Sequence, residues 1–278
     1  MTNQYEGAVA TARDYYNSED ADNFYHRVWG GEDIHIGLYE SDEEAIPDAS
    51  RRTVAHMGDL LGEPTRDMKV LDIGAGYGGA ARYLASTFGC HVTALNLSEV
   101  ENERDRQMNK ALKLDHLVDV LDASFESVPA EDNSFDVVWS QDAILHSGNR
   151  AKVMEEVARV LKPGGVFIFT DPMQTDDAPK EKLQPILDRI HLETLGSPGF
   201  YRDTAKKVGL EEIGFEDHSH QLPRHYGRVF KELESREESL KGLISDDYIA
   251  RMKKGLQHWV DGGKAGHLCW GIFRFRKV

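Results

Sequence analysis

The chain has 278 residues, of which 40% are hydrophobic and 9% aromatic, enough to bury the core of one large or two small domains. Its 48 acidic residues outnumber 33 basic ones and give a formal net charge of −15, which disfavours a nucleic-acid partner because a phosphate backbone binds to positive surfaces. The sequence contains no basic, apolar leader and no apolar run of about 18 residues, so we expect a soluble cytoplasmic protein that does not bind membranes.

The acidic residues are dispersed, in segments such as EDAD, ESDEE and ELESREE. A dispersed anionic surface favours adaptation to a salt-rich host, and we expect stability and activity to respond to molar salt. The two cysteines, Cys90 and Cys269, fall in predicted strands far apart in the sequence, which favours buried thiols over a disulfide. No metal-ligand spacing is present, so the sequence predicts no metal site.

Residues 5–29 are predicted to be helical, with an interruption at the polar NSEDAD. The overlapping stretch NFYHRVWGGEDIHIGLY is too aromatic and too irregular for an ordinary amphipathic helix. Its rings either cover one end of a sheet or contact a ligand, and the residue types alone favour neither. A helix from Arg51 to Leu61 then leads to the first strand.

From residue 70 to residue 170, predicted strands alternate with helices. The strands are Val70–Ile73, Val92–Asn96, Leu117–Leu121, Phe135–Ser140 and Val166–Thr170, and the helices between them are the segment AARYLAS, Glu99–Leu112 and Arg150–Leu161, the last of which stops at KPGG. Alternation with short links predicts an α/β fold with a doubly wound, mostly parallel sheet.

Beyond Asp171 the regular alternation of short strands and helices ends. Two short helices, at 184–196 and 199–210, precede a sixth strand within 209–219, and a final strand covers Leu268–Phe275. The charged, helical stretch before that final strand is too long for a simple connection. We therefore expect a single domain, 1–278, divided into N-terminal lid helices (1–62), a ligand-binding core (63–221), a helical cap (222–263) and the final strand (264–278).

The stretch VLDIGAGYGG predicts a buried strand, a tight turn and a helix N-terminus, where glycines permit the turn and the close approach of a ligand. Gly74, Gly76 and Gly79 also match the dinucleotide fingerprint G-x-G-x-x-G. Asp72, however, would repel a pyrophosphate and attract an ammonium group. The next strand ends at Asn96 instead of the acid expected at an NAD ribose, so an NAD-dependent oxidoreductase is the disfavoured alternative.

The segment SQDAILHS follows the fourth strand, and its Asp142 and His146 are spaced i,i+4, so a helical turn would place them on one face. A carboxylate and an imidazole suit a substrate that is a cation before reaction and a neutral amine during it. The alternative is that Asp142 caps a turn and His146 is a core residue, and an isolated pair of this kind favours that alternative.

Resemblance adds to these patterns. D-x-G-x-G-x-G after a strand resembles the first motif of the class I methyltransferases that use S-adenosylmethionine (SAM), which implies a Rossmann-like fold with SAM in the core. DAILH resembles the phosphoethanolamine methyltransferases. The whole chain resembles more closely the sarcosine/dimethylglycine N-methyltransferases of glycine betaine synthesis, through FYHRVWGGEDIHIGLY, LDIGAGYGGAAR, VVWSQDAILHS, ARVLKPGG, TDPM, QPILDRI, GFYRDTAK, HYGRV and GLQHWVDGGKAG.

This resemblance implies methyl transfer from SAM to sarcosine and dimethylglycine, and it assigns expected roles. The cofactor would contact Tyr25, Trp29, Asp72, Gly74, Gly76, Asn96, Asp122, Ala123, Ser124 and Gln141. The catalytic residues would be His146 and Asp142. The substrate would meet Asp142 and His146, the rings of Tyr16, Tyr201, Tyr226 and Trp29, and Arg189 or Arg202, which could grip its carboxylate.

Several alternatives stay open. A methyltransferase for phosphoethanolamine would need a phosphate-binding cluster of Lys, Arg and Tyr, which the sequence does not clearly contain. A non-catalytic SAM-binding protein would bind SAM without transferring its methyl group. We expect a monomer or a weak homo-oligomer whose partner is a small amino-acid substrate.

Overall fold

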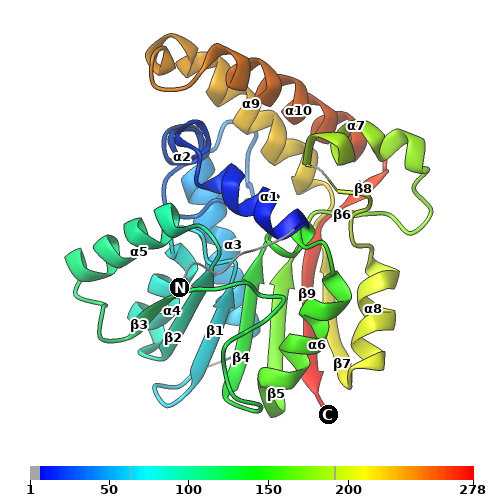
Figure 1. Ribbon diagram of the computed structural model, residues 1–278. Helices are drawn as coiled ribbons and strands as arrows, with labels where there is room; N and C mark the ends of the chain where they lie inside the picture. Colours follow the sequence, from blue (N-terminus) through cyan, green and yellow to red (C-terminus); the bar gives the residue numbers. More distant parts are fainter. Residues whose placement is uncertain (1–6, 63, 191) are drawn as a thin grey trace.

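A seven-stranded sheet forms the centre of the computed structural model, which describes residues 7–62, 64–190 and 192–278 (Figure 1). The strand order is β3-β2-β1-β4-β5-β9-β7. The strands are β1 (Lys69–Ile73), β2 (His91–Asn96), β3 (Val118–Asp122), β4 (Phe135–Gln141), β5 (Leu161–Thr170), β7 (Leu210–Asp217) and β9 (Gly271–Lys277). Strands β1 to β5 pair in parallel, whereas β9 runs antiparallel between β5 and β7. The predicted doubly wound, mostly parallel α/β sheet is confirmed.

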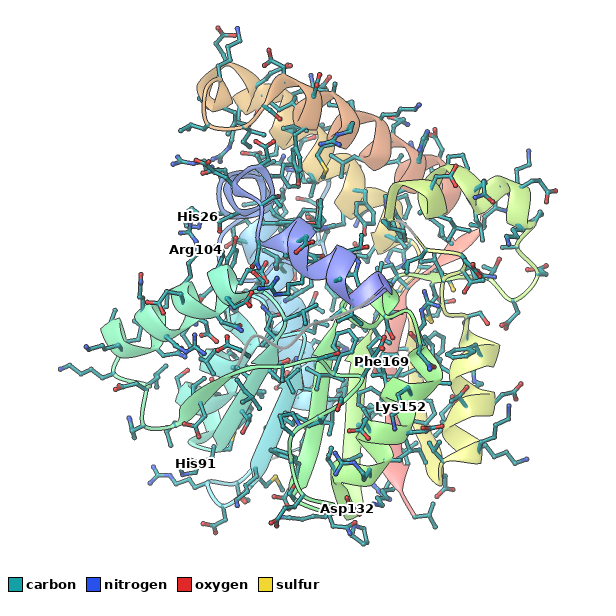
Figure 2. All side chains as sticks on the ribbon, viewed as in Figure 1. His26, His91, Arg104, Asp132, Lys152 and Phe169 are labelled. Atoms are coloured by element: carbon teal, nitrogen blue, oxygen red, sulfur yellow. The ribbon has the colours of Figure 1, made fainter. Side chains whose placement is uncertain are left out.

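Helices flank the sheet and bury its apolar side chains in two clusters. These helices are α3 (Ile46–Leu60), α4 (Gly79–Phe88), α5 (Glu99–Ala111), α6 (Arg150–Val160) and α8 (Pro198–Lys207). Residues of α3 and α4 belong to one cluster and residues of α6 and α8 to the other. Phe169, labelled on β5 in Figure 2, stacks on Phe273 of β9 with ring centroids 5.4 Å apart. Such stacking holds the antiparallel strand β9 against β5, one strand in from the edge of the sheet.

A second group of helices lies above the carboxyl ends of the parallel strands (Figure 1). It consists of α1 (Gly7–Tyr16), α2 (Glu19–Phe24), the π-helical turn Tyr25–Trp29, α7 (Lys180–Ile190), α9 (Gln221–Leu240) and α10 (Asp246–Lys264). A third apolar cluster joins these elements, and in it Tyr226 of α9 stacks on Trp259 of α10 at 4.9 Å. The segments expected to be a lid and a cap thus pack on each other over the sheet edge where ligands bind in this type of fold.

Several boundaries differ from the sequence-based expectation. Helix α7 covers Lys180–Ile190, whereas a helix was expected at 184–196. Helix α3 begins at Ile46 and not at Arg51, because Pro47 in the first turn needs no hydrogen-bond acceptor for a backbone N–H. The predicted last strand is divided at Trp270 into β9 and a short β8 (Leu268–Cys269), which pairs with β6 (Met173–Gln174). KPGG lies within β5, as an irregularity where the pairing steps from Phe135↔Leu161 to Val137↔Val166.

Both cysteines are buried and free, as predicted. Within the described ranges, no helix combines the length and apolar character needed to span a lipid bilayer.

Candidate active site

Two adjoining cavities open at the carboxyl ends of the parallel strands, with volumes of about 810 Å³ and 80 Å³. The smaller cavity borders the glycine loop and the ends of β2 and β4. The larger cavity lies under α1, α7 and α10 and is walled by aromatic rings. Both cavities share Ala12, Tyr16, Ile34, Asp142 and His146. Two molecules bound in these cavities would meet at that shared wall.

The glycine loop is shaped by close contacts as well as by its turn. Gly74 and Gly76 have positive φ values of 77° and 55°, which residues with a side chain rarely adopt. A Cβ atom on Gly74 would lie 2.2 Å from the Cβ atom of Ala143, and one on Gly76 would lie 3.2 Å from Ile34. The glycines therefore let the segment that carries Asp142 and the loop after α2 approach the cavity floor.

Asp72 lies below this loop and does not line either cavity. Its Oδ2 atom has no hydrogen-bond partner among the described residues. Burial, followed by repulsion from the neighbouring carboxylates of Asp105 and Asp33, raises its pKa to about 8. In the structure Asp72 is thus a buried, weakly acidic group that has no direct access to the cavity.

The end of β2 brings an unexpected acid to the smaller cavity. Asn96 lines this cavity and donates from Nδ2 to Oε2 of Glu101 at 2.8 Å. Glu101 lines the same cavity, and burial raises its pKa to about 7, although the hydrogen bond from Asn96 opposes that shift. A pair of amide and carboxyl group therefore stands where many dinucleotide sites carry a single acid at the ribose.

Sequence reasoning missed Glu101, although a signal for its position exists. Ser98 and Glu101 have the S-x-x-E spacing of a capping box, and the Ser98 hydroxyl accepts a hydrogen bond from the Glu101 N–H at 3.2 Å. Such a box marks a helix start directly after a strand, at the sheet edge that holds the site. The Glu101 side chain, however, accepts from Asn96.

The other predicted cofactor contacts divide into two groups. Gln141 and Ser124 line the smaller cavity, and the Gln141 Nε2 atom is buried without a hydrogen-bond partner among the described residues. Asp122 and Ala123 do not line it. The Asp122 carboxylate instead accepts hydrogen bonds from Asn102 at 2.6 Å and from Arg106 at 2.7 Å, both on α5.

Asp142 is held by two donors from distant parts of the chain. Its Oδ2 atom accepts the Ile36 N–H at 2.6 Å, and its Oδ1 atom accepts the Trp270 indole N–H at 2.8 Å. Burial raises the pKa of Asp142, while its contacts with His35, Ile36 and Trp270 oppose the rise. Its φ of 51° is unusual for a residue other than glycine and turns the chain sharply after β4. Trp270 is a second site residue that spacing could not reveal, because it lies 128 positions from Asp142.

His146 ends a short 3₁₀ turn, Ile144–His146, but Asp142, with its positive φ, lies outside this turn, so the helical turn expected from Asp142 to His146 is only partly formed. Its Nε2 atom lies 2.8 Å from the Tyr16 hydroxyl oxygen, and the two rings meet edge to face with centroids 5.4 Å apart. Burial raises the pKa of Tyr16 well above its usual range, so Tyr16 stays a neutral hydroxyl at physiological pH. Helix α1 therefore supplies a direct partner for the imidazole.

The remaining aromatic candidates lie around the larger cavity. Tyr25, Trp29 and Tyr226 line it, together with Tyr16. Tyr25 and Trp29, expected at the cofactor, do not line the smaller cavity. The Trp29 indole N–H is buried and has no hydrogen-bond partner among the described residues. The ring faces of these residues can attract a methylated cation, and the Trp29 N–H can donate a hydrogen bond to an acceptor group on the same molecule.

Neither predicted arginine is seen at this wall. Arg202 pairs with Glu212, its Nε lying 2.8 Å from Oε2, and stacks over Phe215 and Phe273, so it does not line either cavity. Arg189 belongs to α7, but its side chain falls outside the described residues. Tyr201 is also remote from both cavities, since it is buried and its hydroxyl donates to Asp171 at 2.6 Å.

Comparison with known proteins yields consistent matches. Residues 71–169 match a family model described as a methyltransferase domain. The chain is 64% identical, over the full length of both proteins, to a sarcosine/dimethylglycine N-methyltransferase from Halorhodospira halochloris. It is 54% identical to one from Aphanothece halophytica, over 98% of each chain. A crystal structure of a Galdieria sulphuraria protein, proposed there to be a sarcosine dimethylglycine methyltransferase, superposes with a TM-score of 0.90 at 46% identity, covering 95% of this chain and 98% of that one.

Proposed function

Because the chain belongs to the sarcosine/dimethylglycine N-methyltransferases, within the class I methyltransferases that use SAM, we propose that it methylates sarcosine and then N,N-dimethylglycine to give glycine betaine. The observation that carries this proposal is the shared wall of Tyr16, Asp142 and His146 between the two cavities. SAM binds along the glycine loop, and because the smaller cavity cannot hold the whole molecule, SAM extends past the shared wall into the larger cavity, which also holds the amine.

Each methyl transfer needs a neutral nitrogen. The substrate ammonium first loses a proton, and the nitrogen lone pair then attacks the methyl carbon of SAM while the bond from that carbon to sulfur breaks. His146, held by the Tyr16 hydroxyl at 2.8 Å, is the proton acceptor, and the buried Asp142 carboxylate stabilises the substrate ammonium before the proton leaves and the methylated ammonium that forms on transfer. The quaternary product has no N–H left to lose, so methylation stops there.

Binding of the product and the substrate follows from the cavity walls. Tyr16, Tyr25, Trp29 and Tyr226 offer ring faces to the methylated nitrogen, an attraction that does not depend on an N–H group. The unpaired Trp29 indole N–H is a donor for the substrate carboxylate. On the cofactor side, Glu101 and Asn96 accept and donate hydrogen bonds at the ribose, and Gln141 donates from its free amide.

The proposal is tested by incubating the protein with methyl-labelled SAM and, separately, with glycine, sarcosine, dimethylglycine or phosphoethanolamine. Label is expected in the products from sarcosine and dimethylglycine. Label in phosphoethanolamine alone would overturn the substrate assignment, and tight SAM binding without any transfer would identify a non-catalytic binding protein. The role of the wall between the two cavities is tested with His146→Ala. This variant should still bind S-adenosylhomocysteine but should no longer transfer a methyl group to the amine.

A further inference from the structure

A group of three potential metal ligands lies outside both cavities, where a side chain of helix α3 reaches the end of the edge strand β7. His56 of α3, together with Glu216 and His218, places one ligand atom of each residue within 4.8 Å of the others. Glu216 and His218 are two positions apart at the end of the strand, so their side chains leave on the same side. His56 reaches them from a segment 160 residues earlier, which explains why no spacing pattern predicted the group.

The geometry of the three ligand atoms is close to what a tetrahedral metal ion requires. The Nε2 atoms of His56 and His218 both point at one oxygen, Glu216 Oε2, at 2.6 Å and 3.3 Å. With metal–ligand distances of about 2.0–2.1 Å, neighbouring ligand atoms in a tetrahedral zinc site are separated by roughly 3.3 Å. The His218–Glu216 pair already has this separation, and the His56–Glu216 pair must open by only about 0.7 Å to reach it.

The donor set also restricts the identity of the ion. Two imidazole nitrogens and one carboxylate oxygen favour zinc and its first-row neighbours, whereas magnesium and calcium prefer sites built from several oxygens. The three side chains are partly exposed, at 37%, 32% and 24% for His56, Glu216 and His218, so solvent can supply the remaining ligands. Since none of the three residues lines either cavity, the ion would not contact the reactants.

From this juxtaposition we propose that His56, Glu216 and His218 form a binding site for one divalent transition-metal ion of the zinc class, which clamps helix α3 to the edge of the sheet. The fluorescence of Trp270 can report whether a metal ion is bound at this site. The ring of Trp270 lies 6.2 Å from the ring of His218, and the His218 backbone N–H donates to the Trp270 carbonyl oxygen at 3.0 Å. A paramagnetic ion at the site would therefore quench the fluorescence of this tryptophan.

The test uses the full-length protein, freed of metal by a chelator, and titrates it with Zn²⁺ by calorimetry and with Co²⁺ by visible absorption and tryptophan fluorescence. We expect one ion per chain, a higher Tm with Zn²⁺ and quenching with Co²⁺. His56→Ala and His218→Ala should each weaken binding at least about 100-fold, since even residues that only support a ligand contribute 10- to 100-fold. His56→Gln, which retains a polar group beside Glu216, keeps the test valid if an alanine variant folds poorly.

His91→Ala is the matched control, because His91 is an exposed histidine on β2, toward the opposite edge of the sheet from β7 (Figure 2). This variant should bind Zn²⁺ and Co²⁺ as the parent does. The proposal would be overturned if the protein did not bind either metal ion at a 100-fold excess of metal over protein. It would also be overturned if the His56 and His218 variants bound the metal ions as well as the parent does. Neither result would bear on methyl transfer, which the labelled-SAM assay measures separately.

Discussion

The Tyr16 hydroxyl oxygen lies 2.8 Å from His146 Nε2 and joins the first described helix to the turn after β4. Tyr16→Phe keeps the ring but removes this contact. Because general acid–base assistance contributes roughly 10²-fold or more, we expect kcat to fall by about that factor, with a much smaller change in the KM for dimethylglycine. Steady-state kinetics across pH measure both parameters. Tyr15→Phe is the control, since the Tyr15 hydroxyl faces Tyr25 and Tyr248; an equal loss in both variants would contradict the role of Tyr16.

Trp270→Phe should shift the pH dependence of the reaction. The indole N–H is one of two donors that stabilise the ionised form of Asp142, and they oppose the rise in its pKa caused by burial. Without that donor the pKa rises further, so the carboxylate becomes protonated at a higher pH. We expect the acidic limb of kcat/KM to move upward in pH, while S-adenosylhomocysteine binding, measured by calorimetry, stays unchanged. An unshifted limb would show that Asp142 does not need to be ionised.

Glu101 makes cofactor binding dependent on pH. Burial raises its pKa to about 7, and the ionised form is the better acceptor for ribose hydroxyl groups. The affinity for S-adenosylhomocysteine should therefore rise between pH 6 and pH 8, and Glu101→Gln should lower it by roughly 10- to 100-fold and flatten the dependence. Calorimetry at three pH values tests this. Glu103→Gln, on the exposed side of the same helix, should behave like the parent.

Asp72 should limit stability at alkaline pH. Its folded-state pKa of about 8 exceeds the unfolded value near 4, so the folded state holds the proton more tightly and loses stability as pH rises toward 8. Asp72→Asn removes this loss. Its advantage in the free energy of unfolding should grow by at most about 1.4 kcal/mol per pH unit and level off above pH 8.

Urea denaturation of the ligand-free protein at pH 5.5, 7 and 8.5 measures that advantage. A difference that is constant across pH would contradict the assignment. Asp119→Asn, at an exposed position of β3, is the matched control and should not show a growing advantage.

Molar salt should stabilise the protein. The formal net charge of −15 produces self-repulsion in the compact state, and raising ionic strength from 0.1 M to 1 M shortens the screening length from about 10 Å to 3 Å. We expect the Tm to increase over this range. A Tm that does not change with NaCl would contradict adaptation of the surface to salt.

The sequence predicts the sheet better than it predicts the site, for a physical reason. Alternating strands and helices constrain topology strongly, and residues at strand ends, such as Asn96 and Gln141, line a cavity because all parallel strands end at one edge. The insertion of β9 between β5 and β7 has no local signal, since pairing order depends on the whole chain.

Residues on the covering helices are harder to place. Periodicity identifies the buried face of a helix, but it does not fix where that helix sits over the sheet. Tyr25 and Trp29, expected at the cofactor, thus line the larger cavity and not the smaller one. Arg202, expected at the substrate carboxylate, forms an ion pair with Glu212. Trp270 could not be predicted either, because it lies 128 positions from Asp142 and belongs to no motif that contains that residue.

The contact of Trp270 with Asp142 couples the site to the pairing of the antiparallel strand. The Asp142 carboxylate accepts a hydrogen bond from an indole that directly precedes β9, the strand that joins β5 to β7. Loss of pairing along β9 would therefore separate β7 from β5 and leave a buried acid short of a donor, so damage at this side of the sheet would impair the site although no cavity residue changes.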